Sequence, residues 1–112
     1  MTTDASTTAP APCDIDTLVA DPARPVLVDC YTPGCGPCAA IAPVLDELAA
    51  ELHGRLVVEK VDVAAQPDVA RRFGVRGVPT LLLFKGGHLK AVRTGAATRT
   101  QVLTWLSAQG AV

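Results

Sequence analysis

"PVLVDCYTPGCGPCAAIAPVLDELAAELHG", residues 25–54, decides the fold, because its hydrophobic pattern changes from that of a strand to that of a helix. Residues 25–31 form a nearly continuous apolar run entered by a proline, the pattern of a strand covered on both faces. From Cys35 onward, apolar residues recur at helical spacing until Gly54, which stands where a helix C-cap favours a left-handed residue. Residues 55–63 predict a second strand, so the helix is a crossover between two parallel strands.

The second half of the chain predicts two helices and a hairpin. Residues 66–74, QPDVARRFG, predict a short helix with a proline in its first turn and a glycine just past its end. Residues 79–95 contain two β-rich runs joined by a Gly-Gly pair, a two-residue hairpin turn that makes these strands antiparallel. Thr98 and Gln101 have capping-box spacing ahead of a final apolar helix face. The chain is therefore expected to be an α/β domain.

Length and charge limit the classes of function. The chain has 112 residues, about half of them apolar, which suits one globular domain with its own core. Its formal net charge of −1 gives no electrostatic footprint for nucleic acid or for an anionic membrane. Residues 1–12 lack the basic and apolar regions of a secretory signal and predict a flexible leader ahead of a domain over residues 13–112. We expect a cytoplasmic monomer, in a compartment where thiols are kept reduced.

Two cysteines, Cys35 and Cys38, are separated by Gly36 and Pro37 at the start of the predicted helix. Unpaired N–H groups and the helix dipole favour an anion there, so Cys35 is expected to have a lowered pKa and to attack as a thiolate. Cys38 lies one turn further in, more sheltered but close enough to resolve a mixed disulfide formed by Cys35. Pro37 stiffens the turn and holds both sulfurs near disulfide geometry.

The residues alone leave two other interpretations of the cysteine pair. A structural zinc site needs a second pair of Cys or His ligands at short spacing. Cys13 and Cys30 are seventeen positions apart, and His53 and His88 stand alone, so no metal site is predicted. Two inert buried thiols are the second alternative, but a Cys-x-x-Cys pair inside a βαβ unit is a redox signal.

The chain resembles the thioredoxin family in three segments, VLVDCYTPGCGPCAAIAPVLDELAAE, VEKVDVAAQPDVARRFGVRGVPTLLLFKGG and TGA. The resemblance covers about residues 14–110 and implies the thioredoxin fold, a central mixed β-sheet flanked by helices on both faces. It also implies a general dithiol–disulfide oxidoreductase that reduces protein disulfides, with Cys35 as the nucleophile and Cys38 as the resolving cysteine. Thioredoxin reductase, fed by NADPH, would supply the electrons, and no cofactor would be bound.

The resemblance assigns roles to residues around the cysteines. Asp29 matches the family's buried aspartate behind the second cysteine, and burial in an apolar strand would raise its pKa and make it a proton acceptor for Cys38. Lys60 matches a lysine on the neighbouring strand whose ammonium would partly offset the charge on Asp29. Pro79 matches the family's cis-proline facing the cysteines. Val78, beside it, would offer its backbone N–H and C=O groups to a substrate strand.

The substrate-binding surface implied by the resemblance consists mainly of small residues around the cysteines: Gly34, Gly36, Pro37, Gly77, Val78, Gly95 and Ala96. The sequence departs from the family at Gly34, where a tryptophan is usual, and at Cys30 and Tyr31, where Phe-Trp is usual. Loss of a large aromatic side chain beside the cysteines removes apolar docking area. Two alternatives to a reductase stay open: an oxidant or isomerase of the same fold, and a binding module that works without redox chemistry.

Three residues are given roles outside the chemistry. Cys30 follows Asp29 on its strand and is therefore expected to face the other side of the sheet as a small buried hydrophobic residue. Trp105, on the last helix, is expected to pack against the core. Cys13 is expected to be an exposed and incidental thiol, and the prolines of the leader disfavour the first edge strand of the family.

Overall fold

The computed structural model describes residues 14–112, which form four helices and four strands. In chain order these are α1 (Ile15–Leu18), β1 (Val26–Tyr31), α2 (Gly36–Glu51), β2 (Val57–Asp62), α3 (Pro67–Phe73), β3 (Thr80–Lys85), β4 (His88–Thr94) and α4 (Arg99–Ala108). The predicted leader, its boundary, the role of Cys13 and the family's first edge strand all lie outside the described residues. Within the part of the chain that is described, no helix has the length and apolarity to cross a lipid bilayer.

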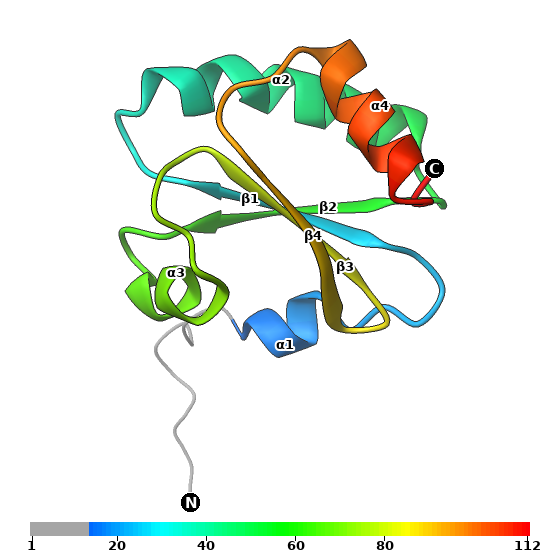
Figure 1. Ribbon diagram of the computed structural model, residues 1–112, viewed down its shortest axis with the longest axis horizontal. Helices are drawn as coiled ribbons and strands as arrows, with labels where there is room; N and C mark the ends of the chain where they lie inside the picture. Colours follow the sequence, from blue (N-terminus) through cyan, green and yellow to red (C-terminus); the bar gives the residue numbers. More distant parts are fainter. Residues whose placement is uncertain (1–13) are drawn as a thin grey trace, which may run out of the picture.

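The four described strands form one mixed sheet in the order β2-β1-β3-β4. β1 and β2 are parallel and are joined through α2, as the change of hydrophobic period predicts. β3 pairs antiparallel with both β1 and β4. Helices α2 and α4 cover one face of the sheet, and α1 and α3 cover the other (Figure 1). This confirms the predicted central mixed sheet with helices on both faces.

β1 lies between two apolar cores and belongs to both of them. On the side of α2 and α4, Leu27 packs in a core that includes Leu45. On the side of α1 and α3, Val28 and Cys30 belong to the second core. Because successive side chains of a strand point to opposite faces, Asp29 shares the α2 side with Leu27. Cys30 has no exposed surface, which confirms its prediction as a small buried hydrophobic residue on the other face.

Glycines end one helix and form the hairpin as predicted. The C-cap of α3 is Gly74, with a left-handed φ of 71°. The turn between β3 and β4 consists of Gly86 and Gly87, with φ values of 60° and 82°. A residue with a Cβ atom rarely adopts these angles, so the sequence signal is strong at both places.

The predicted cap of α2 is wrong. The helix continues through Pro43 but ends at Glu51, and its C-cap is Leu52, which has a φ of −102°. Gly54 does adopt a positive φ, of 89°, but two residues beyond the cap. The carbonyl oxygen of Leu52 accepts N–H groups from the residues that follow Gly54, so the turn after the helix, rather than the helix end, requires the glycine.

The predicted capping box begins α4. Thr98 Oγ1 accepts the N–H of Gln101 at 3.1 Å, and Gln101 Oε1 accepts the N–H of Thr98 at 2.9 Å. The helix buries Val102 and Leu106, and Trp105 packs partly buried against the same core, as predicted. The capping box thus fixes the start of the helix that covers the core beside α2.

Replacing Thr98 with alanine is expected to lower the free energy of unfolding by about 1 kcal/mol, because the N–H of Gln101 loses its acceptor. Urea unfolding at pH 7 measures the change. Thr100→Ala, at an exposed position of the same helix that does not form the cap, is the matched control. Equal stability of the two variants would show that the box does not stabilise α4.

Candidate active site

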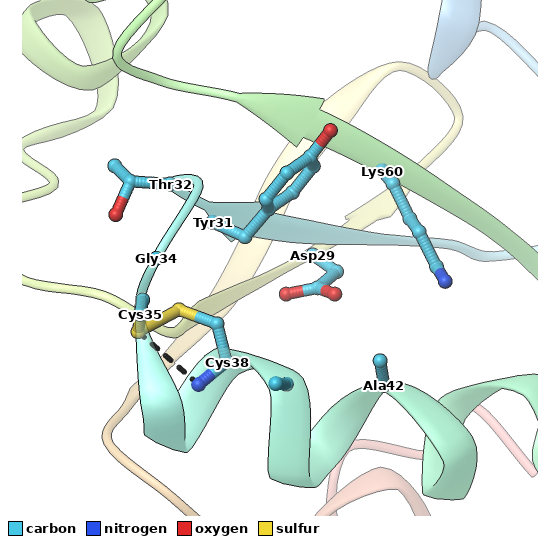
Figure 2. A pocket seen from close by; sticks show the side chains of 9 residues that line it. Asp29, Tyr31, Thr32, Gly34, Cys35, Cys38, Ala42 and Lys60 are labelled. Atoms are coloured by element: carbon cyan, nitrogen blue, oxygen red, sulfur yellow. Dashed lines mark hydrogen bonds between the residues drawn. A yellow bond between two sulfur atoms is a disulfide. The ribbon is translucent and has the colours of Figure 1, made fainter.

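The two cysteines of the predicted pair form a disulfide at the N-terminus of α2. Cys35 is the N-cap residue, and its Sγ atom accepts the N–H of Cys38 at 3.1 Å (Figure 2). The two Cα atoms are 5.2 Å apart. Cys35 is partly exposed, whereas Cys38 is only 5 % exposed, and the predicted attacking and resolving roles expect this difference. A thiolate on Cys35 would be stabilised by the same N–H group and by the helix dipole.

The loop before β3 faces the cysteine pair. Its Val78–Pro79 peptide bond is cis, as the resemblance implies. The Cys35 Sγ atom lies 4.0 Å from the carbonyl oxygen of Val78. Gly95, just after β4, donates its N–H to the carbonyl oxygen of Pro79 at 2.8 Å. Among residues 14–112, neither backbone polar group of Val78 forms a backbone hydrogen bond, so both remain available to a partner.

Four other predicted docking residues are exposed. Gly36 and Pro37 occupy the first turn of α2, and both are exposed. Gly77 is exposed in the loop before β3, and its carbonyl oxygen accepts the hydroxyl of Thr80 at 2.6 Å. Ala96 is exposed in the segment after β4. These four positions are therefore accessible to a partner, as the predicted docking role needs.

A cavity of about 340 Å³ lies behind the disulfide, between the start of α2 and strands β1 and β2. Its lining residues are Asp29, Tyr31, Thr32, Gly34, Cys35, Cys38, Ala39, Ala42 and Lys60. Figure 2 shows the Asp29 side chain pointing from β1 toward α2. The sequence prediction included Asp29, the cysteines, Gly34 and Lys60, but missed the other four residues.

Asp29 is 2 % exposed, and its Oδ1 atom has no hydrogen-bond partner among residues 14–112. Burial raises the pKa of Asp29 to about 6, although attraction to Lys60 lowers it and repulsion from Asp46 adds to the increase. The direction and the main cause agree with the sequence prediction. A carboxyl group that exchanges its proton near neutral pH suits the predicted proton transfer with Cys38.

Lys60 is the register partner of Asp29 across the β1–β2 pair, as expected for a lysine that offsets its charge. Its Nζ atom, however, forms an ion pair with Asp46 Oδ1 at 3.1 Å. Sequence reasoning missed Asp46. A signal was present, because Cys38, Ala42 and Asp46 are spaced by four residues and so lie on one face of α2.

Several residues that line the cavity have short side chains or none. Gly34 has a φ of 78°, and a Cβ atom built there would meet no heavy atom within 4 Å. Ala39 and Ala42 line the α2 side of the cavity. Tyr31, at a position where the family usually has tryptophan, contributes the aromatic side chain of the lining. Two of the three departures from the family pattern, Gly34 and Tyr31, thus line this cavity, whereas Cys30 does not.

The remaining described thiol, Cys30, takes no part in this site. It lies on the opposite face of the sheet from Asp29. Burial raises the pKa of Cys30 to about 12, and the charge of Asp29 adds to the increase, so a reactive thiolate is disfavoured. Within residues 14–112, no three His, Cys, Asp or Glu side chains are grouped as a metal site would need.

Known proteins are similar in sequence to this chain over most of its length. The thioredoxin family model matches residues 8–108. A thioredoxin of Pseudomonas aeruginosa is 46 % identical over 93 residues, which cover 83 % of this chain and 84 % of the relative. Thioredoxins of Acidithiobacillus ferridurans and Haemophilus influenzae are 43 % and 42 % identical over 94 residues, covering 84 % of this chain and 87 % and 88 % of the relatives. The chain therefore belongs to the thioredoxin family, and it is a thiol–disulfide oxidoreductase that reduces protein disulfides.

Proposed function

We propose that Cys35 is the nucleophile of this reduction and that Cys38 resolves the intermediate. The Cys35 thiolate attacks one sulfur of a substrate disulfide, forms a mixed disulfide and releases the other substrate sulfur as a thiolate. Cys38 then attacks Cys35 Sγ, which releases the second substrate thiolate and forms the Cys35–Cys38 disulfide. Two electrons pass from the protein dithiol to the substrate.

One observation carries this assignment, the position of the Cys35–Cys38 disulfide at the N-terminus of α2 beside the cis-proline loop. Cys35 is the more exposed of the two residues, so a macromolecular substrate reaches it first. The helix N-terminus favours its thiolate over its thiol. Cys38 is shielded from solvent and meets only a partner already attached to Cys35.

Asp29 is the proposed proton acceptor for Cys38. Both side chains line the same cavity, and the space of about 340 Å³ admits water that bridges them. The pKa of Asp29, raised to about 6 by burial, leaves the carboxylate able to accept a proton above that pH. Lys60 tempers this basicity through its positive charge.

The substrate is proposed to bind as an extended segment along Val78. The N–H and C=O groups of Val78, which form no backbone hydrogen bond within residues 14–112, suit pairing with a substrate backbone, a mode of binding that reads shape more than sequence. Gly34, Gly36, Pro37, Gly77, Pro79, Gly95 and Ala96 would surround that segment. Their small side chains leave room for many different partners.

The electron supply and the setting are proposed from family membership. Thioredoxin reductase, drawing on NADPH, would reduce the Cys35–Cys38 disulfide after each turnover, and the protein itself would bind no cofactor. A cytoplasmic monomer fits this role, because a reductant needs a compartment that keeps thiols reduced.

A Cys38→Ser variant tests the order of attack. It is expected to accumulate a mixed disulfide between Cys35 and its substrate, because the second thiol that would release the substrate is missing. Non-reducing electrophoresis and mass spectrometry of tryptic peptides identify the linked cysteine. Cys35→Ser is the matched control and is expected to trap no partner; a partner attached to Cys38 in that control instead would reverse the assigned roles.

A further inference from the structure

Lys60, which lines the cavity, has two carboxylates on the neighbouring elements, Asp29 on β1 and Asp46 on α2. Lys60 and Asp29 are register partners on adjacent strands, so the Lys60 side chain begins next to the residue that carries the buried carboxylate. Its Nζ atom nevertheless lies 3.1 Å from Asp46 Oδ1, on α2. The Oδ1 atom of Asp29 has no hydrogen-bond partner among residues 14–112. Asp46 thus binds the cation that could otherwise pair with Asp29.

Burial explains why Lys60 pairs with Asp46. The side chains of Lys60 and Asp46 are 41 % and 67 % exposed, whereas Asp29 is 2 % exposed. An ammonium that moved inward toward Asp29 would lose hydration, and this cost offsets the stronger attraction inside the protein. Beside Asp46 the ammonium keeps both its water and a partner. The favoured position of the charge is therefore the solvent side of the cavity.

We propose that Asp46 is a positioning residue for the reaction, which binds the Lys60 ammonium on the solvent side of the cavity and so prevents it from neutralising Asp29. The inference rests on the proposed role of Asp29 as the proton acceptor for Cys38. A carboxylate without a cation in contact is the stronger base, and a stronger base removes the Cys38 proton more readily.

Asp46 raises the pKa of Asp29 in two ways. Burial is the largest cause of the raised pKa of Asp29, and Lys60 is the group that lowers it. The negative charge of Asp46 raises the pKa of Asp29 directly. Asp46 also restrains the ammonium that would lower it further. Removal of Asp46 should therefore lower the pKa of Asp29 through both effects.

The other titratable groups around Asp29 do not replace Asp46. Cys35 and Cys38 carry no charge in the disulfide form. Tyr31 lines the cavity from the same strand as Asp29. Asp62 shares the Lys60 face of β2, but its carboxylate accepts two N–H groups of the following turn, at 2.9 and 3.2 Å. The β3 residue paired with Asp29 is apolar.

The test is the titration of the Asp29 carboxyl in the oxidised protein, followed by NMR of its side-chain carbon. Asp46→Asn is expected to move the midpoint to lower pH, and Lys60→Gln to move it to higher pH, each by about one unit. In the Lys60→Gln background, Asp46→Asn should lower the midpoint by a smaller amount, because only its direct repulsion is left to remove.

Glu47→Gln is the matched control. It removes one negative charge from the next residue of α2, where the carboxylate lies 3.7 Å from Arg99 instead of Lys60. It is expected to leave the Asp29 midpoint nearly unchanged. The proposal is overturned if Asp46→Asn leaves the midpoint in place, raises it, or shifts it no more than Glu47→Gln does. An equal shift by Asp46→Asn with and without Lys60 would also overturn it.

The pH dependence of the resolving step separates this inference from the proposed function. The rate at which Cys38 releases substrate from a preformed mixed disulfide should change with pH around the Asp29 midpoint measured in the same variant. The profile of Asp46→Asn should therefore be displaced to lower pH. If the Asp29 midpoint moves as expected but the release profile does not, Asp29 is not the proton acceptor, and the role of Asp46 in the reaction is overturned with it. The placement of the Lys60 charge by Asp46 would still stand.

Discussion

Replacing Cys35 with serine is expected to lower the rate of protein disulfide reduction by at least about a thousandfold. A serine hydroxyl cannot form a disulfide with the substrate or with Cys38, so neither half of the reaction remains. The reduction of insulin by dithiothreitol, followed through the turbidity of the released chains, measures the loss. Circular dichroism verifies that the variant is folded.

Cys30→Ala is the control for this result. Cys30 is buried on the opposite face of the sheet, so its removal costs stability but leaves the reacting sulfurs in place. Its rate of insulin reduction should stay close to that of the natural protein at a temperature where both are folded. Substantial reduction by the Cys35→Ser variant would instead place the chemistry at another thiol.

The ionisation of Asp29 is expected to lower the free energy of unfolding of the natural protein by about 3 kcal/mol as the pH rises from 3 to 8, and replacing Asp29 with asparagine should remove this loss. Burial raises the pKa of Asp29 from 3.8 to about 6, so the folded protein holds this proton more tightly than the unfolded chain does. The unfolded chain ionises first as the pH rises, and stability therefore falls through this window and stays lower above it. Asparagine does not ionise and shows no such fall.

Urea unfolding of both oxidised proteins across this pH range measures the difference. Subtracting the two curves cancels the other titrating groups and the fixed cost of a buried amide. The difference should be nearly constant below about pH 3, should grow in favour of the variant up to about pH 7 and should then level off. A difference that stays flat, or that favours the natural protein as the pH rises, would contradict the raised pKa. The variant should also resolve mixed disulfides more slowly at neutral pH, because Cys38 loses its proton acceptor.

Most of the fold is predictable from the sequence because the local signals agree with one another. The change from an apolar run to helical spacing after residue 31 predicts the β1–α2–β2 unit, and the Gly86–Gly87 pair predicts the antiparallel hairpin. Helix α1 was not predicted, because a single turn of Ile15–Leu18 is too short to show a period. It depends on Asp14, whose carboxylate accepts N–H groups at its start.

The reactive part of the site is also predictable, because the cysteines and their helix N-terminus are adjacent in sequence. Asp29 and Lys60 came from the family resemblance and from the expected burial of β1. Spacing alone does not single out Asp46, because its contact with Lys60 depends on how α2 packs across β2. The open cavity beside Gly34 likewise depends on segments that meet only in the folded chain.

The equilibrium reduction potential of the Cys35–Cys38 pair tests the central claim most directly. The measurement uses glutathione or dithiothreitol redox buffers and the mass shift on thiol alkylation, in a Cys13→Ser background that retains the buried Cys30. A reductant of protein disulfides predicts a value near about −270 mV. A value above roughly −200 mV would place the pair among oxidants and isomerases and contradict the reductase account.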